Sequence, residues 1–215
     1  WTQANEPIRF WEPNGGQEKY LAEFYRPGAF IVVNGSGNGG GKTHVVVALL
    51  TAVCWPLMAP PAIRDDIVQN WTNPKRARII STHKEVEEIG SIQTTIKELF
   101  PSGRYTTLRG GKKYDAQYVT DTGWVIDIMT YDQDKDDFAG PSIGLTIFNE
   151  PMPEPIWKES LARTRKGGIV LVAMTSLLSE PWVVDGILSK ADGNNIRVIY
   201  CDQEENCIEH GKNGR

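Results

Sequence analysis

The sequence lacks several features that would assign it to a broad class of protein. No apolar run approaches the roughly 18–20 residues that a membrane-spanning helix needs, so a transmembrane protein is excluded and no membrane partner is expected. The three cysteines among 215 residues show neither a disulfide pattern nor metal-ligand spacing, which favours a reducing, intracellular setting. The chain also has no initiator Met and no signal peptide, so we interpret its start as unnatural or processed.

Positive charge is not in excess either. The sequence has 23 Lys and Arg residues against 27 Asp and Glu residues, for a net charge of −4. A globally basic nucleic-acid-binding surface is therefore excluded, whereas a local basic patch is not. Glycine, in contrast, is abundant: 21 of the 215 residues are Gly, against a usual share of about 7%.

Apolar, β-branched runs alternate with helical stretches along the chain. This alternation predicts an α/β fold with a mostly parallel central sheet covered by helices on both faces. The segment 55–74, with four prolines, is expected to be an irregular connection, and we interpret the polar tail after Cys201 as a truncation point. The predicted elements are the strand Ala29–Asn34, the helix Lys42–Cys54, the strand Ala77–Ser81, the helix Lys84–Phe100, a hairpin of Tyr118–Thr120 and Trp124–Met129, the strand Ile143–Phe148, the helix Pro155–Arg163, and the strands Ile169–Met174 and Asn195–Cys201.

The clearest motif is a glycine-rich loop between the first predicted strand and the first predicted helix. The segment Asn34-Gly-Ser-Gly-Asn-Gly-Gly-Gly-Lys-Thr43 has the composition of a P-loop, in which successive backbone N–H groups point at phosphate oxygens. The helix N-terminus adds partial positive charge. Lys42 would reach the β- and γ-phosphates, and the Thr43 hydroxyl would take a Mg²⁺ position.

The G-x₄-G-K-[ST] pattern expects glycine at Ser36, and Gly35 lies one place early. A glycine-rich turn with a chance Gly-Lys-Thr is the alternative interpretation. The residues of this segment expected to contact ATP are Ser36, Gly37, Asn38, Gly39, Gly40, Gly41, Lys42, Thr43 and His44, although His44 also fits an ordinary helix position.

A second part of the predicted site is the apolar strand that ends in Asn149-Glu150. P-loop nucleotidases use a carboxylate at the end of such a strand to hold Mg²⁺ and to orient water. Glu150 can act as general base on the attacking water. Asn149 can accept a hydrogen bond from a metal-bound water, but it has no charge to offset Mg²⁺. An acidic turn after a core strand is the alternative.

Two further segments are candidates for nucleotide contacts. Thr175 follows a buried strand, and ligands of α/β sheets bind outside the carboxyl ends of strands, so its hydroxyl could sense the γ-phosphate. Upstream, Trp11 could stack on a purine, and the Gln17 amide could pair with the adenine edge because it both donates and accepts. A turn residue, a surface aromatic and a solvated Gln are the respective alternatives.

The order of these motifs resembles the N-terminal ATPase domain of phage terminase large subunits, the motors that package DNA into procapsids. The likeness runs from about Phe10 to Asn206. It places Gln17 at the adenine-recognising glutamine, Ser36–Thr43 at Walker A and Ile143–Glu150 at Walker B, with Glu150 as the catalytic glutamate. Leu171–Leu177 resembles the coupling motif and Pro181-Trp182 follows it, which implies that Thr175 couples hydrolysis to DNA movement. Tyr131–Gly140 resembles the approach to Walker B.

The resemblance implies a RecA-like (ASCE) P-loop NTPase that uses ATP and Mg²⁺ to move double-stranded DNA. It implies one ATPase domain over residues 1–215, with an adenine-side segment (1–28), a P-loop core (29–201) and a tail (202–215) that would lead to an RNase H-like nuclease. Nuclease activity is therefore not expected in this chain. The implied partners are the portal of a procapsid, a small terminase subunit and further copies of the chain in a ring, with five copies expected, in the host cytoplasm.

The chain departs from the family pattern at two positions. It has Asn38 where many relatives carry a basic residue in the P-loop, and Ala139 where many carry Arg before the glycine. Arg163 and Arg165 are our candidates for an arginine finger, with a solvated basic helix end as the alternative. The candidate contacts to the DNA backbone are Lys75–Arg78, Arg109–Lys113 and Arg163–Lys166, each of which could also be an ordinary solvated face.

Two other functions stay open at this point. One is a helicase-like or other RecA-type ATPase. The other is a nucleotide-binding assembly module with little hydrolysis, which the uncharged Asn149 permits.

Overall fold

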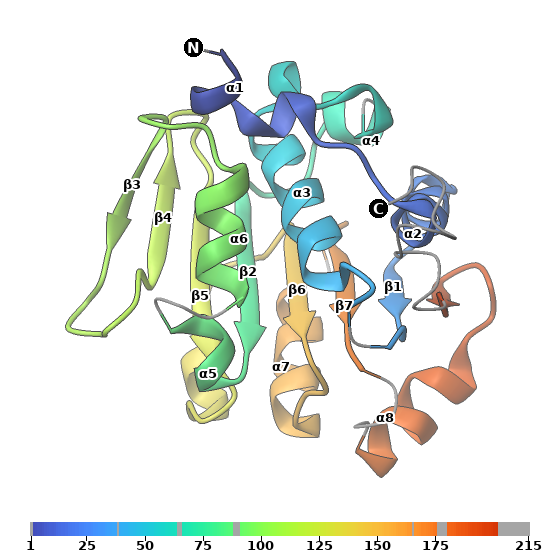
Figure 1. The fold of residues 1–215 in the computed structure, drawn as a ribbon. Helices are drawn as coiled ribbons and strands as arrows, with labels where there is room; N and C mark the ends of the chain where they lie inside the picture. The colour runs from blue at the N-terminus through green and yellow to red at the C-terminus, as the bar shows by residue number, and fades with distance from the viewer. Residues whose placement is uncertain are drawn as a thin grey trace.

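The protein is an eight-stranded, mostly parallel sheet with helices on both faces (Figure 1), as seen in a computed structural model. The structure describes residues 2–37, 39–63, 66–87, 91–164, 166–175 and 180–201. The strand order is β3-β4-β5-β2-β6-β7-β1-β8, and only the β3–β4 and β4–β5 pairs are antiparallel. The strands are β1 (Ile31–Asn34), β2 (Arg76–Ser81), β3 (Tyr105–Leu108), β4 (Gln117–Thr120), β5 (Val125–Thr130), β6 (Leu145–Asn149), β7 (Ile169–Ala173) and β8 (Ile196–Ile199). The predicted α/β fold is therefore confirmed.

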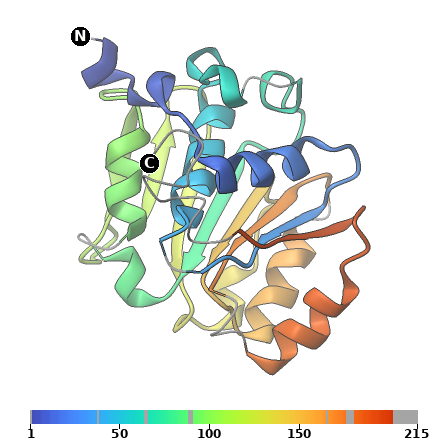
Figure 2. The same cartoon turned by 45° about the vertical axis from the view of Figure 1, so that its right-hand side comes forward.

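The central strands bury side chains on both faces of the sheet, as parallel strands between two helix layers must. On β7, Leu171 and Ala173 pack into the core shared with α3 and α6, whereas Val170 and Val172 pack into the core shared with α7 and α8. The turned view of Figure 2 shows α7 and α8 on the side of the sheet away from α3. This two-sided burial explains why the central strands appear in the sequence as continuous apolar runs.

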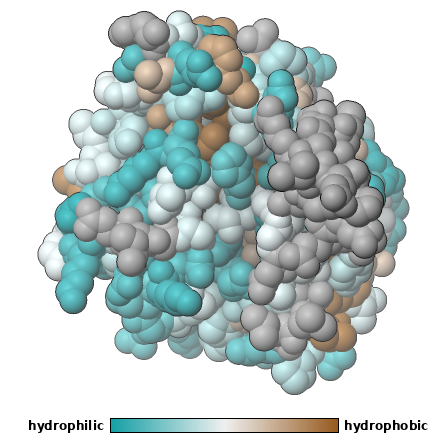
Figure 3. All heavy atoms as spheres, in the orientation of Figure 1, coloured by the Kyte–Doolittle hydropathy of each residue, from teal (hydrophilic) through white to brown (hydrophobic). Residues whose placement is uncertain are grey.

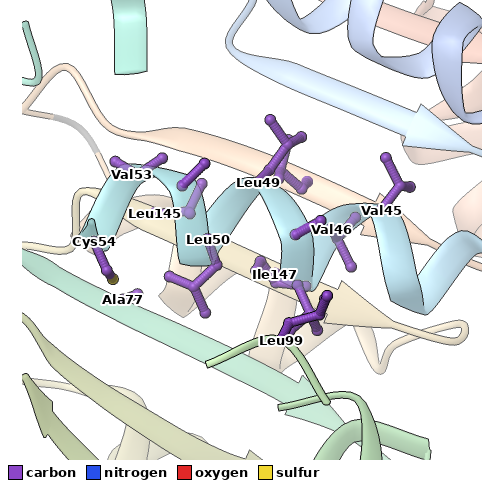
Figure 4. Close-up of a cluster of buried hydrophobic side chains, with 14 of the residues drawn as sticks. Val45, Val46, Leu49, Leu50, Val53, Cys54, Ala77, Leu99, Leu145 and Ile147 are labelled. Carbon is purple, nitrogen blue, oxygen red and sulfur yellow. The ribbon is translucent and has the colours of Figure 1, made fainter. Parts of the chain in front are cut away.

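The helix α3 (Lys42–Cys54) is buried almost all round, which suits its apolar sequence from Val45 onward, where Thr51 is the one polar residue. Figure 4 shows Val46, Leu49 and Leu50 of α3 among side chains of neighbouring strands and of α6. The other helices are α1 (Thr2–Asn5), α2 (Gly15–Tyr25), α4 (Asp66–Gln69), α5 (His83–Val86), α6 (Ser91–Leu99), α7 (Glu154–Arg163) and α8 (Pro181–Gly186). Short 3₁₀ helices are η1 (Pro7–Phe10), η2 (Pro56–Met58), η3 (Pro61–Ile63), η4 (Lys135–Phe138) and η6 (Leu188–Lys190).

Several predicted elements differ from the structure. The single predicted helix Lys84–Phe100 is wrong: α5 ends at Val86, and Glu87 has a ψ of 164°, outside the helical region. The segment 55–74 contains short helical turns as well as irregular chain. The strand β3 was not predicted because three of its four residues are exposed, so it has no apolar alternation. The helix α2 was not predicted, although Asn14 and Gln17 form a capping box at its start.

The visible surface is mainly hydrophilic, with small hydrophobic areas (Figure 3). The large apolar residues that are exposed in the described part of the chain are Phe10, Leu57, Leu108, Val184 and Tyr200. Among the described residues, no helix combines the length and the apolar character needed to cross a bilayer.

Candidate nucleotide-binding site

The glycine-rich loop connects the carboxyl end of β1 directly to the first turn of α3. Asn34 is the last residue of β1 and Lys42 is the first of α3. Gly41 caps the helix with a φ of +70°, a left-handed conformation that glycine adopts without strain. A Cβ at Gly41 would also lie 2.5 Å from Nε2 of Gln17, so a side chain there would displace the Gln17 amide. The strand–loop–helix context that a phosphate loop requires is therefore present.

Three residues predicted to be catalytic lie in a connected chain. Nζ of Lys42 donates to the Gly37 carbonyl at 2.8 Å and contacts Oγ1 of Thr175 at 3.4 Å. The backbone N–H of Thr175 donates to Oε2 of Glu150 at 3.1 Å. Burial lowers the pKa of Lys42, and the charge of Glu150 opposes this shift. The ends of α3, β6 and β7 thus place a cation, a hydroxyl and a carboxylate side by side.

The backbone of Glu150 has an unusual conformation. Its φ of +73° makes it the one non-glycine residue with positive φ in the part of the chain that the structure describes. A side chain in this region is sterically strained, and such strain persists where surrounding contacts fix it. The fixing contacts here are the Glu150 N–H bond to the Ala173 carbonyl at 2.7 Å and the Tyr131 hydroxyl, which donates to the carbonyls of Asn149 at 3.0 Å and Glu150 at 2.8 Å.

Tyr131 and Ser81 are the site residues that the sequence analysis missed. The Tyr131 hydroxyl supports the backbone of Glu150, and its pKa is raised by burial and by the charge of Glu150. Ser81, the last residue of β2, bonds to Asn149. Ser81 ends β2, the neighbour of β6, and Tyr131 follows β5, one strand further along the sheet, so a rule that inspects polar residues at the carboxyl ends of nearby strands would have found them.

Asn149 joins the first turn of α3 to β2. Its Oδ1 accepts from the Thr43 hydroxyl at 2.7 Å, and its Nδ2 donates to Oγ of Ser81 at 3.2 Å. The Ser81 hydroxyl donates in turn to the Asn149 carbonyl at 2.8 Å. Asn149 is 2% exposed, so these bonds satisfy an amide that water does not reach. Both ends of the amide are thus matched to their partners.

The residues at this position fit a hard cation such as Mg²⁺. Thr43 and Asn149 present a hydroxyl and an amide oxygen, and Mg²⁺ prefers oxygen ligands, commonly completed by phosphate oxygens and water. No group of three or more His, Cys, Asp or Glu residues suited to a metal occurs among the described residues. Because Thr43 and Asn149 are uncharged, the bound nucleotide would have to supply the negative charge that balances Mg²⁺ at this position.

Ser36 connects the start of the glycine-rich loop to Asn34 and to Cys201 through hydrogen bonds. Its hydroxyl and N–H both bond to the Asn34 side chain, and the hydroxyl accepts from the N–H of Cys201 at 2.8 Å. Ser36 is 2% exposed. Its side chain therefore ties the loop to the end of β8. The predicted contacts of Gly37, Gly39 and Gly40 with a nucleotide stay predictions, and Asn38 lies outside the described residues.

Comparisons with known proteins give structural matches. No protein-family model and no curated protein matches the sequence. The large terminase of the thermophilic bacteriophage D6E, solved in complex with ADP, aligns over 91% of this chain with a TM-score of 0.58 and 18% identity. The large terminase ATPase domain of Thermus phage P74-26 aligns over 91% of this chain and 82% of its own, with a TM-score of 0.56 and 13% identity. The chain has the fold of a phage large terminase ATPase domain.

The predicted resemblance to terminase ATPase domains is thus confirmed in the fold. The chain spans 46% of the length of the D6E large terminase. In this fold, Lys42, Thr43, Glu150 and Thr175 lie at the same edge of the sheet, and their functional roles stay predictions.

Trp11 is placed differently from the prediction of a stacking residue. It is 8% exposed, and its Nε1–H donates to Nδ1 of His44 at 2.8 Å, with the two rings stacked at 6.1 Å between centroids. Burial lowers the pKa of His44, and Glu98, 3.8 Å from its Nε2, opposes this shift. In this terminase fold, Trp11 and His44 anchor the N-terminal segment to α3, and the buried indole offers little surface to a base.

Gln17 lies at the loop, but its amide is already bonded to the backbone. Oε1 accepts from the N–H of Asn14 at 3.0 Å, and Nε2 donates to the Gly41 carbonyl at 3.0 Å. The bonded amide holds the start of α2 against the glycine-rich loop. Recognition of adenine by Gln17 stays a prediction, and it would use the second N–H and the second lone pair of the amide.

The arginine-finger candidate Arg163 is held within its own chain. Its guanidinium bonds to Glu159 at 2.7 and 2.9 Å, and Nη1 donates to the Gly140 carbonyl at 3.4 Å. Arg165 lies outside the described residues. The finger role of either arginine stays a prediction.

The basic cluster Lys75–Arg78 is largely committed to internal bonds. Arg76 pairs with Asp127 through Nε and Nη2. Arg78 is 3% exposed and donates to the carbonyls of Phe138 and Ala139. Arg78 is therefore not available to a DNA backbone in this conformation, because β2 carries it into the interior.

Proposed function

We propose that this chain is the ATP-hydrolysing motor domain of a phage DNA-packaging terminase. The observation that carries the proposal is the chain of contacts from Lys42 through Thr175 to Glu150 at the carboxyl ends of the strands, beside a glycine loop that opens a helix. The comparison with the D6E large terminase, which was solved with ADP, supports a nucleotide site in this fold.

Each residue has a role that follows from its position. Lys42 and the loop amides bind the phosphates, as in other phosphate loops. Glu150 accepts a proton from the attacking water, since its carboxylate lies at the end of β6 with one oxygen held by the Thr175 N–H. Thr175 contacts both Lys42 and Glu150, so it can report loss of the γ-phosphate along β7. Mg²⁺, held by Thr43 and through water by Asn149, would neutralise charge on the β- and γ-phosphate oxygens.

The wider packaging role is part of the same proposal. The motor would form a ring with other copies, act at the portal of a procapsid with a small terminase subunit in the host cytoplasm, and contact double-stranded DNA mainly through its backbone. A translocating motor must accept any sequence, and backbone contacts carry no sequence information.

The proposal is tested by ATP hydrolysis and binding measured on the same variants. Lys42→Ala should remove nucleotide binding, and Glu150→Gln should abolish turnover while ATP still binds. Retained hydrolysis in Glu150→Gln would remove Glu150 from its role. Stimulation that depends on DNA length without strand separation favours the packaging motor, whereas strand separation would favour a helicase.

A second candidate is a nucleotide-binding assembly module with little hydrolysis. The observation in its favour is Asn149, whose amide replaces the charge that a carboxylate would offer to Mg²⁺. Hydrolysis measured with and without Mg²⁺, and with DNA and further copies of the chain present, separates the two. ATP binding without any Mg²⁺-dependent turnover under these conditions would favour the module.

A further inference from the structure

The end of β8 runs beside the start of the phosphate loop. β8 pairs with β1 in parallel at the edge of the sheet, with Ile199 opposite Asn34. Beyond the strands this pairing continues: the Gly35 N–H donates to the Ile199 carbonyl at 2.9 Å, and the Cys201 N–H donates to Oγ of Ser36 at 2.8 Å. The segment 199–201 is therefore fixed against the loop by backbone hydrogen bonds at Ile199 and Cys201, one on each side of residue 200.

The same segment also touches the start of α2. Sγ of Cys201 donates to the Gly16 carbonyl at 3.3 Å, and the next residue, Gln17, bonds to Gly41 at the far end of the loop. The loop, the start of α2 and the end of β8 thus converge. Ligands of parallel sheets bind outside the carboxyl ends of the strands. If the phosphates of a nucleotide occupy the loop, a part of the nucleotide that extends toward β8 therefore lies near residue 200.

Residue 200 is a tyrosine with an exposed ring on the loop. Tyr200 is 58% exposed. A Cβ built on Gly35 would lie 2.7 Å from its Cε1, so the ring approaches the loop backbone closely and a side chain at Gly35 would displace it. Trp11, the aromatic that the sequence suggested for this task, is 8% exposed and bonded to His44.

We propose that Tyr200 is the residue on which the nucleotide base stacks. The inference rests on the proposed function, because it needs a nucleotide whose phosphates occupy the loop. An aromatic ring binds any base through its π-face, so stacking adds affinity without choosing between adenine and guanine. Tyr200 therefore binds the base of a purine nucleotide, and selection of adenine is left to polar groups such as the Gln17 amide.

The test compares three ligands on the 215-residue chain: ATP, GTP and inorganic tripolyphosphate, with affinities measured by calorimetry. The variants are Tyr200→Ala, Tyr200→Leu, which keeps apolar bulk on Gly35 without a π-face, and Tyr200→Phe. The control is Leu108→Ala, which removes an exposed apolar side chain at β3, the opposite edge of the sheet.

We expect Tyr200→Ala and Tyr200→Leu to weaken both purine nucleotides about tenfold, while tripolyphosphate binds unchanged, Tyr200→Phe retains affinity and Leu108→Ala has no effect. The fluorescence of ethenoadenosine triphosphate, which stacking quenches, should rise in the complexes of the Ala and Leu variants. Unchanged ATP affinity in these two variants would overturn the inference. Equal losses for ATP and tripolyphosphate would overturn it too, because they would show a defect of the loop.

The outcome for the proposed function is separate. If Lys42→Ala removes ATP binding while the Tyr200 variants leave it unchanged, the nucleotide site stands and the base is bound elsewhere. If the unsubstituted chain binds neither ATP nor tripolyphosphate, the proposed function fails and the inference fails with it.

Discussion

The strained backbone at Glu150 predicts that glycine stabilises this position. A left-handed conformation costs a residue with a Cβ roughly 1–2 kcal/mol, and glycine avoids this cost. Glycine also gives the unfolded chain more freedom, which offsets about 0.4–1 kcal/mol of the gain. Glu150→Gly should therefore exceed Glu150→Ala by about 0.5–1 kcal/mol in free energy of unfolding. For a domain of roughly 150–250 residues, this is about 1–4 °C in Tm.

The comparison between the two variants isolates the backbone. Both lose the carboxylate and its bond from the Thr175 N–H, so both should also lose ATP hydrolysis. The measurement is thermal and denaturant unfolding without nucleotide. Lys158, an exposed residue within α7, is the control: there Lys158→Gly should be less stable than Lys158→Ala by about 1 kcal/mol, the opposite order. A Glu150→Gly variant no more stable than Glu150→Ala would refute the idea that Glu150 is strained.

Three other substitutions test separate contacts of the site. Asn149→Asp should destabilise the Mg²⁺-free protein by about 1–3 kcal/mol, because the buried amide donates to Ser81 and a carboxylate cannot donate. A higher Tm of the Asp variant without Mg²⁺ would contradict this prediction. Tyr131→Phe releases the carbonyl of Glu150, so it should lower kcat for ATP hydrolysis about tenfold without raising KM. A tenfold lower kcat corresponds to a barrier higher by about 1.4 kcal/mol. An unchanged kcat would show that the Tyr131 hydroxyl has no part in positioning Glu150. His44→Gln should reduce the loss of stability on acidification. Burial lowers the pKa of His44 in the folded protein, and a carboxylate on α6 only partly opposes this shift. The unfolded chain therefore takes up a proton at a higher pH than the folded protein, and the free energy of unfolding falls as the pH drops below about 6.5. Denaturant unfolding between about pH 7.5 and about pH 5 measures this slope, and equal slopes in both proteins would rule out His44 as its source.

The sequence predicted the core of the fold because its signals are local. The helix Lys42–Cys54 has the predicted bounds, and β6 and β7 agree with their predicted strands to within two residues at each end. Continuous apolar runs identify strands that are buried on both faces, and the glycine loop marks the turn between β1 and α3. The same rule fails for β3, which lies at the edge of the sheet with exposed side chains and therefore has no such run.

The proximity of the proposed catalytic residues could be predicted for a similar reason. Lys42, Glu150 and Thr175 each follow a predicted strand or loop, and parallel strands bring their carboxyl ends to one edge. The placement of Trp11 and Gln17 could not be predicted in this way, because both residues precede β1 and their positions depend on tertiary packing. A sequence shows that an indole or an amide is present, but not that it is already bonded to His44 or to Gly41.

The sequence also does not show which of the predicted DNA-contacting residues are already paired inside the protein, and the structure reduces the number of candidates. A basic residue can neutralise a phosphate without a large cost only if its charge is not already paired inside the protein. Arg109 pairs with Asp115 at 3.0 Å, and Lys112 lies 5.2 Å from the centre of the Tyr114 ring, whereas Lys113 is exposed. If this loop contacts DNA, Lys113→Ala should weaken DNA binding at low salt and reduce the salt dependence of the logarithm of affinity by about one unit of slope. A slope equal to that of the unsubstituted protein would place the DNA contact on another face.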